Sequence, residues 1–234
     1  MKFPPSLLTF LKTPIFSVIT ILFVICTTIV LAEAFLPNDR QIKNIGAEYG
    51  KQAAKRIRQW SRLINTAQHV SERKKLDLVN RFFNKVRFIS DRKHWSREDY
   101  WATPIEFLIT NGGDCEDFSI AKYFTLRAVG VDASKLRMIY VKATNPNQAH
   151  MILAYYSAPG KVPLILDNLV KEILPGTKRR DLVPVYSFNG DYLWLAKELK
   201  GRGEMVGSAT RISLWNKVQR KMRKEKQKFV ARER

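Results

Sequence analysis

Apolar positions in the first half of the chain recur at helical spacing. The first stripe, within residues 45–65, consists of Tyr49, Ala53, Ile57, Trp60 and Ile64. A second stripe lies within residues 72–87 and follows Ser71, a candidate N-cap. Steps of three and four residues place the apolar side chains on one face of a helix. The pattern therefore predicts two amphipathic helices, preceded by a polar linker over residues 35–44.

The next segments alternate between loop and helix signals. Residues 95–104 form a polar-aromatic stretch typical of a loop, and residues 105–109 are a short apolar segment that ends at the turn signal Asn111-Gly112-Gly113. Residues 115–128 contain neither Gly nor Pro and stop just before Gly130, which predicts a helix. Its apolar residues lie nearly all round, so we expect this helix to be buried.

Beyond residue 130 the pattern changes to short β-like runs. Residues 136–143, 150–156 and 162–167 are rich in β-branched and aromatic residues and are separated by Pro, Gly or Asn. They predict consecutive antiparallel strands. Residues 185–196 indicate a further hairpin, with Asn189-Gly190 at its turn. Helices followed by an antiparallel sheet predict a fold of the α+β class.

The N-terminal segment has the features of an export signal or a membrane anchor. Residues 13–32 carry no charge, Lys2 and Lys12 precede them, and Ala32-Glu33-Ala34 fits a small-x-small cleavage site. About 20 apolar residues are also enough to span a bilayer. Residues 1–34 are therefore a signal peptide or a retained anchor, and both readings send the rest of the chain out of the cytoplasm.

The charge of the chain is strongly positive. Lys and Arg number 41 against 21 Asp and Glu, which gives a net charge of +20, and removal of residues 1–34 leaves +19. Residues 201–234 form a basic C-terminal tail, within which we expect a solvated helix over residues 211–234. Such charge attracts anionic lipid, acidic protein surfaces or nucleic acid. Because the sequence contains no nucleic-acid-binding motif, we expect no nucleic acid partner. We expect the positive charge to attract the acidic surface of a substrate or receptor instead.

Cysteine and histidine are scarce, which narrows the candidate chemistry. Two Cys and three His exclude a disulfide scaffold and a multi-cysteine zinc site. Cys26 lies in the apolar N-terminal segment, so Cys115 is the sole cysteine of the exported part. It begins the helix predicted over residues 115–128, where partial positive charge lowers a thiol pKa and backbone N–H groups can hold an oxyanion. Cys115 is therefore a candidate nucleophile.

A cysteine nucleophile needs a base and an orienting acid. His69 and His94 lie in polar segments, whereas His150 opens an apolar strand. Asp167 ends the next predicted strand, and antiparallel neighbours would place these two strand ends side by side. Asp167 could then accept a hydrogen bond from one ring nitrogen of His150. Taken singly, a half-buried histidine and a turn-starting aspartate are the simpler readings, but their order after Cys115 favours a catalytic set.

Several sequence blocks carry a family resemblance. They are residues 99–124, 135–143, 149–156, 163–169 and 181–189. In this order they resemble the bacterial transglutaminase-like cysteine proteinases of the LapG type, over roughly residues 45–195. The resemblance implies a transglutaminase/papain-like core in a domain of residues 45–200, with the nucleophile-bearing helix packed on the sheet. It also implies a triad of Cys115, His150 and Asp167.

Three acids flank the candidate nucleophile. Unpaired, Asp114, Glu116 and Asp117 would raise the pKa of the Cys115 thiol by like-charge repulsion. They could be ordinary first-turn helix acids, or a hard cation could neutralise them. The spacing is not that of an EF-hand loop. The family resemblance implies calcium dependence, with Asp114 and Glu116 as ligands and Asp117 as a further candidate.

The resemblance also implies a biological role. Proteinases of the LapG type act in the periplasm of Gram-negative bacteria and cut a very large RTX-type surface adhesin near its N-terminus, at a di-alanine site, which disperses the biofilm. An inner-membrane cyclic-di-GMP receptor sequesters the proteinase. Two other readings stay open: another thioester acyl-transfer enzyme, such as a transglutaminase or amidase, and a non-catalytic binding module held at the membrane by its basic tail. Trp101 could line the cleft, but a core aromatic is the simpler reading.

Overall fold

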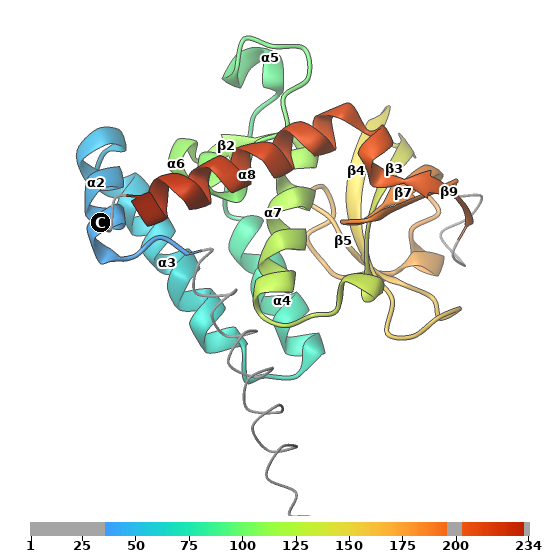
Figure 1. Ribbon diagram of the computed structural model, residues 1–234. Coiled ribbons are helices and arrows are strands. Elements are labelled where there is room, and N and C mark those ends of the chain that lie inside the picture. Colours follow the sequence, from blue (N-terminus) through green and yellow to red (C-terminus); the bar gives the residue numbers. More distant parts are fainter. Residues whose placement is uncertain (1–35, 196–202, 232–234) are drawn as a thin grey trace, which may run out of the picture. The chain divides into compact units, whose positions relative to one another are not determined.

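A single antiparallel sheet organises the second half of the protein (Figure 1). The computed structural model describes residues 36–195 and 203–231, and within them seven strands form this sheet in the order β6-β5-β4-β3-β7-β8-β9. The strands are β3 (Leu136–Thr144), β4 (Asn147–Tyr155), β5 (Leu164–Leu166), β6 (Leu174–Pro175), β7 (Leu182–Phe188), β8 (Tyr192–Leu195) and β9 (Glu204–Ser208). The three predicted strands and the hairpin that turns at Asn189-Gly190 correspond to β3, β4, β5 and β7–β8.

Helices precede the sheet and cover one side of it (Figure 1). They are α2 (Asp39–Tyr49), α3 (Lys51–Ala67), α4 (Glu72–Phe83), α5 (Asp91–His94), α6 (Pro104–Thr110), α7 (Cys115–Ala128) and, after the sheet, α8 (Ser213–Ala231). Two short parallel strands, β1 (Arg87–Phe88) and β2 (Gly112–Gly113), join the segments before α5 and α7. Helix α7 packs on β4 and β3 on one side and on α4 and α6 on the other. The nucleophile-bearing helix therefore lies between the helical layer and the sheet, as the α+β prediction requires.

The core follows from the alternation of side chains along the central strands. Strands β3 and β4 pair in a continuous register that sets Val141 opposite His150. Residues that alternate along a strand share one face. One face of the sheet carries the cluster of Ile139, Val141, Ala143, Ile152, Ala154, Tyr156, Ile165 and Leu182. The face toward the helices carries Met138 and its partner Phe188, whose ring packs against Trp215 of α8. Burial of this apolar face fixes the register, because a slip of one residue would turn it to solvent.

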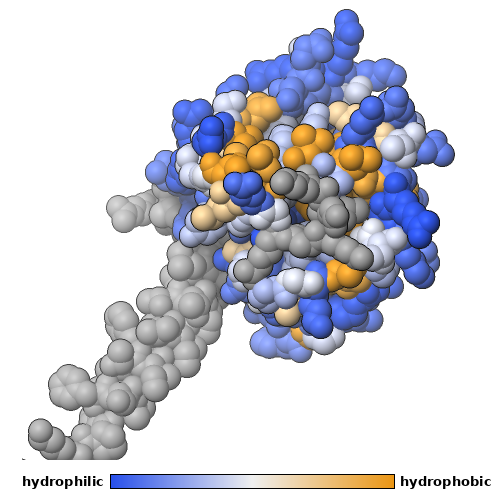
Figure 2. All heavy atoms as spheres, turned by 90° about the vertical axis from the view of Figure 1, so that its right-hand side faces the viewer, coloured by the Kyte–Doolittle hydropathy of each residue, from blue (hydrophilic) through white to orange (hydrophobic). Residues whose placement is uncertain are grey.

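Part of the sheet is open to solvent. Val183 and Val185 of β7 and Met205 of β9 are 50%, 47% and 61% exposed. Figure 2 views the molecule from the side on which these strands lie and shows apolar side chains among polar ones there.

The predicted polar linker over residues 35–44 is wrong in its second half. Helix α2 begins at Asp39 because Asn38 and Gln41 form a capping box: the Gln41 N–H donates to Asn38 Oδ1 at 2.9 Å, and the Asn38 N–H donates to Gln41 Oε1 at 2.7 Å. Ile42 and Ile45 are buried against the rest of the protein. The segment looked polar because only these apolar residues face the core.

The predicted solvated helix over residues 211–234 is also wrong in its packing. Helix α8 forms, but Trp215 and Val218 are 1% and 0% exposed. The Trp215 ring stacks on Phe124 with centroids 5.4 Å apart and meets the edge of Phe188 at 5.5 Å. Residues before the helix add β9 to the edge of the sheet. This part of the chain belongs with the compact unit that begins at Pro37.

The predicted export signal or anchor lies outside the described residues. Among the residues that are described, no helix is both long and apolar enough to cross a membrane.

Candidate active site

Cys115 is the first residue of α7, at the position that the sequence predicts. Asp114 is the N-cap, and its backbone N–H donates to Asp117 Oδ2 at 3.3 Å. Gly113 permits this turn, because a Cβ there would lie 2.2 Å from Asp117 Oδ2 and 2.8 Å from the Phe107 ring. Gly113 thus allows close approach of the backbone to the Asp117 carboxylate.

The surroundings of Cys115 hold it as a neutral thiol in this state. Its Sγ–H donates to Glu116 Oε2 at 2.8 Å. Burial, then the charge of Glu116 and of Asp114, raises the pKa of the Cys115 thiol well above its usual range. These effects therefore outweigh the lowering of the thiol pKa that the sequence predicts from the helix N-terminus. A hydrogen bond from the backbone of Met151 acts in the opposite direction and places the sulfur beside the residue that follows His150.

His150 and Asp167 are in direct contact. His150 Nε2 lies 2.7 Å from Asp167 Oδ1, and each residue is only 1% exposed. The two strands that carry them pair as predicted, with Leu153 opposite Leu166. Antiparallel pairing therefore brings His150 of β4 beside the end of β5, and the hydrogen bond from the Met151 backbone places Cys115 next to the same part of β4.

Asp167 is held by more groups than the sequence indicates. Arg179, itself 3% exposed, places Nη2 2.8 Å from Asp167 Oδ2, and the Leu169 N–H donates to Oδ1 at 3.1 Å. The backbone carbonyl of Asp167 accepts from Lys122 Nζ at 3.0 Å and from Asn84 Nδ2 at 2.9 Å. Burial opposes the charged carboxylate, but the His150 hydrogen bond and the charges of His150 and Arg179 outweigh it and hold the pKa of Asp167 at about 2.

This ionisation state assigns the His150 tautomer. An ionised Asp167 can only accept, so His150 Nε2 carries the proton and donates it to Oδ1. In the neutral form of the ring, Nδ1 is then the unprotonated nitrogen. Such an imidazole is arranged to accept a proton from a nucleophile.

A second group of acids surrounds the nucleophile. Carboxylate oxygens of Asp91, Asp114 and Asp117 lie within 4.8 Å of one another, and so do ligand atoms of Asp114, Cys115 and Glu116. Burial first, then neighbouring acids, raises the pKa of Asp114 to about 8 and that of Asp91 to about 7. Asp91 is a member that sequence reasoning missed, since it lies far upstream in an exposed-looking polar segment.

The carboxylate oxygens of these acids differ in whether they already accept a hydrogen bond. Asp117 Oδ1 accepts from the Ala102 N–H at 2.6 Å, and Asp91 Oδ2 accepts from the Tyr100 N–H at 2.5 Å. Asp91 Oδ1 and Asp114 Oδ1 are buried and have no hydrogen-bond partner within the described part of the chain. Buried carboxylate oxygens without donors are costly unless a cation binds them. This donor set fits a hard, oxygen-preferring cation such as calcium.

Trp101 is a packed aromatic. It is 5% exposed and stacks on Phe188 with ring centroids 5.8 Å apart. Its backbone carbonyl accepts a hydrogen bond from Lys221 of α8 at 2.7 Å. The simpler sequence reading, a core aromatic, agrees with these contacts.

The family model for the bacterial transglutaminase-like cysteine proteinases matches residues 47–181, more than half of the chain. The chain belongs to this family. The resemblance carried by the sequence blocks is therefore confirmed. The protein is a cysteine protease of this family.

Solved structures of Legionella pneumophila LapG are similar to this proteinase over most of its length. The EGTA-treated LapG is 41% identical, with a TM-score of 0.70, and the match covers 80% of this chain and 98% of that one. The calcium-bound LapG is 40% identical, with a TM-score of 0.67 and coverage of 78% and 98%. A comparison with curated proteins gives no match. The mixed fold of helices and antiparallel sheet is that of LapG.

Proposed function

We propose that this proteinase is a calcium-dependent endopeptidase in which Cys115 is the nucleophile, His150 the base and Asp167 the orienting acid. The observation that carries the proposal is the 2.7 Å contact between His150 Nε2 and Asp167 Oδ1 at the edge where α7 presents Cys115. Membership of a cysteine proteinase family supports it. All three residues are present, which argues against a binding module without catalysis.

The reaction follows from these positions. His150 Nδ1 takes the proton from Cys115 Sγ, and the sulfur attacks the carbonyl carbon of the scissile peptide bond. Backbone N–H groups at the N-terminus of α7 stabilise the oxyanion of the tetrahedral intermediate. The imidazolium then gives its proton to the leaving amine, and a thioester remains on Cys115. Water, deprotonated by His150, hydrolyses the thioester and restores the thiol.

Asp167 acts through His150. Its carboxylate holds the Nε2–H and stabilises the imidazolium that forms during both proton transfers. Arg179 and the Leu169 N–H hold that carboxylate in place. A fixed carboxylate keeps one tautomer and one ring orientation.

Calcium would be held by carboxylates beside the nucleophile. The buried Oδ1 atoms of Asp91 and Asp114, which have no donor among the described residues, are the best candidate ligands, and Asp117 and Glu116 are near enough to join them. When bound, the cation would supply positive charge that offsets the acids around Cys115. The calcium-bound and EGTA-treated forms of the related LapG support this assignment.

We infer the substrate and location from the LapG type. The protein is exported to the periplasm through residues 1–34, either cleaved or retained as an inner-membrane anchor. It cuts the N-terminal region of a large RTX-type surface adhesin and so controls biofilm attachment and dispersal. An inner-membrane cyclic-di-GMP receptor sequesters it. The apolar N-terminal segment and the similarity to LapG support these inferences.

A cleavage assay tests the proposal. The full-length protein, produced by export in a Gram-negative host, is incubated with the N-terminal fragment of the organism's large adhesin, in calcium or in excess EGTA. We expect two fragments from the wild type in calcium, and none from Cys115→Ala or in EGTA. Cleavage that EGTA leaves unchanged would contradict the calcium site. A cross-linked product formed with an added amine, in place of two fragments, would show a transglutaminase.

A further inference from the structure

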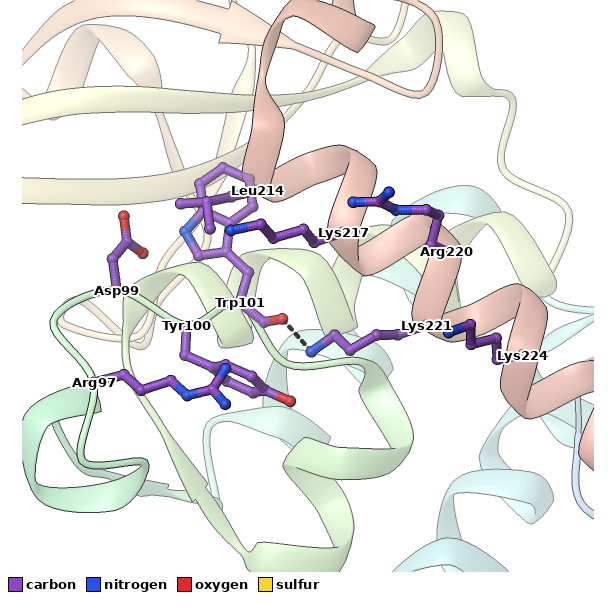
Figure 3. Close-up of a pocket in the computed structure, with 9 residues that line it drawn as sticks. All are labelled: Arg97, Asp99, Tyr100, Trp101, Leu214, Lys217, Arg220, Lys221 and Lys224. Carbon is purple, nitrogen blue, oxygen red and sulfur yellow. Dashed lines mark hydrogen bonds between the residues drawn. The ribbon is translucent and has the colours of Figure 1, made fainter.

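A cationic pocket lies between α8 and residues 97–101 (Figure 3). Its volume is about 330 Å³. Its basic side chains are Arg97, Lys217, Arg220, Lys221 and Lys224. The four that come from α8 occupy positions i, i+3, i+4 and i+7, so they lie along one face of the helix. Figure 3 shows Lys217, Arg220 and Lys221 extending from α8 toward the opposite wall.

Lys221 builds the floor of the pocket. Its Nζ donates to the Trp101 carbonyl at 2.7 Å and to Glu106 Oε2 at 2.6 Å, and it lies 3.9 Å from the centroid of the Tyr100 ring. The charge of Lys221 is therefore matched by Glu106. This lysine fixes α8 against the opposite wall and leaves the other cations to face the pocket.

The remaining four cations are less fully neutralised than Lys221, although the charge of Lys217 acts on Asp99. No ion pair joins Arg97, Lys217, Arg220 or Lys224 to an acid among the residues that the structure describes. Asp99 is the one acid among the lining residues in this part of the chain. The pocket thus has an excess of positive charge in a concave site with aromatic walls, which favours a ligand with several carboxylates.

The pocket adjoins the active site through one short segment. Its wall includes Tyr100 and Trp101, and the next residue, Ala102, donates its N–H to Asp117 Oδ1 at 2.6 Å. Asp117 lies two residues after Cys115 in α7. Asp99, which also lines the pocket, lies close enough to the acids around Cys115 for its charge to raise the pKa of Asp114. The pocket therefore lies near the end of the active site that these acids form.

We propose that this pocket binds an acidic segment of the polypeptide substrate, next to the scissile bond. The inference rests on the endopeptidase function proposed above. An acidic peptide fits better than a lipid surface, because helices that bind membranes present an apolar face beside their cations. In α8 the apolar Trp215 and Val218 are buried, and none of its described side chains is an exposed large hydrophobic one.

Binding can be measured without catalysis. The probe is fluorescein-labelled hexaglutamate, and its anisotropy is followed with the full-length Cys115→Ala protein at low ionic strength. Arg220→Glu is compared with Arg223→Glu, an exposed arginine of the same helix that does not line the pocket. We expect Arg220→Glu to weaken binding roughly tenfold, because it places like charges together, and Arg223→Glu to leave it almost unchanged. Equal weakening by both would overturn the proposal, since it would reflect only the overall charge.

Lipid is tested in parallel. Vesicles of phosphatidylglycerol and phosphatidylcholine in equal parts are sedimented with the same variants. Vesicle binding that depends on Arg220, with no binding of hexaglutamate, would assign the pocket to a membrane and overturn the proposal. Hexaglutamate binding that vesicles do not compete for would support it.

The link to the substrate is read from kinetics. With the N-terminal adhesin fragment, Arg220→Glu should raise KM about tenfold and leave kcat unchanged, while Arg223→Glu should change neither. An unchanged KM together with weaker hexaglutamate binding would overturn the role in substrate binding. If the wild type cleaves nothing, the endopeptidase proposal fails. The pocket proposal is then tested separately, by comparing the affinity of Cys115→Ala for the fragment with that of its Arg220→Glu derivative.

Discussion

His150 Nε2 lies 2.7 Å from Asp167 Oδ1, and the other oxygen of that carboxylate lies 2.8 Å from Arg179 Nη2. The carboxylate is thus shared between the imidazole and a buried guanidinium. Asp167→Asn keeps the shape but replaces the acceptor with an amide. We expect kcat/KM to fall by about a thousandfold or more, as it does when the orienting acid of a triad is replaced. A variant that unfolds at the same temperature and keeps wild-type kcat/KM would contradict this role.

Arg179 should act through the ionisation of Asp167. The ionised carboxylate stabilises the fold above its ordinary pKa of 3.8, and this contribution is lost as the pH falls through the folded value of about 2. Removing the guanidinium in Arg179→Met should move the pKa of Asp167 upward. We expect the midpoint of acid unfolding to shift to higher pH and kcat/KM near neutral pH to fall about tenfold to a hundredfold.

A matched control exists for Arg179. Asp181→Asn removes its other carboxylate partner, which Nη2 contacts at 2.7 Å, but leaves the pair with Asp167. It should lose much less activity than Arg179→Met. Equal losses in the two variants would show that Arg179 only supports the local fold.

Lys122 predicts a pH-dependent stability. Burial lowers the pKa of Lys122 to about 7, with partial compensation from the charge of Asp167. The unfolded chain keeps the ordinary pKa of 10.5, so it binds more protons than the folded state between these values, and stability rises with pH across this window. Lys122→Met should flatten that rise. Urea unfolding at several pH values measures it, with the exposed Lys142→Met as control. The same slope in Lys122→Met and wild type would contradict the assignment.

Asp91 predicts calcium-dependent stability. A ligand that binds only the folded state stabilises it by about 2.7 kcal/mol at a hundred times its Kd. Calcium should therefore raise the unfolding temperature of the wild type, and Asp91→Asn should reduce this rise strongly. The surface variant Asp77→Asn should keep it. An Asp91→Asn protein with the full calcium-dependent rise would exclude Asp91 from the ligand set.

Helix α8 should contribute to the stability of the whole unit. Trp215→Ala removes a ring that is 1% exposed, and loss of such a side chain costs about 3–5 kcal/mol. Leu214→Ala, at a partly exposed position of the same helix, should cost much less. Urea unfolding measures both. A Trp215→Ala protein as stable as the wild type would mean that the helix is a solvated tail after all.

Local signals predicted much of the fold. Helix α7 has the predicted bounds, because Gly113 before it and Gly130 after it limit the helix. Strand positions followed from alternation and turn residues, and the contact between His150 and Asp167 followed from pairing of consecutive strands. Each of these depends on residues close in sequence.

The contacts that the sequence did not predict join residues that lie far apart in the chain. Arg179 and Lys122 look like ordinary surface charges, and only the fold brings them to Asp167. Asp91 joins the acids of α7 through the same kind of long-range contact. The packing of α8 depends on Phe124 and Phe188, which lie in two other elements. No periodicity within a segment reports such contacts.

The most direct test of the account is the detection of the covalent intermediate. The full-length protein is mixed with the N-terminal adhesin fragment in calcium, quenched with acid within one turnover, and measured by intact mass and peptide mapping. The account predicts a thioester that joins the N-terminal part of the substrate to Cys115, and its absence in Cys115→Ala. Two product fragments without any adduct on Cys115, or cleavage that persists in Cys115→Ala, would contradict it.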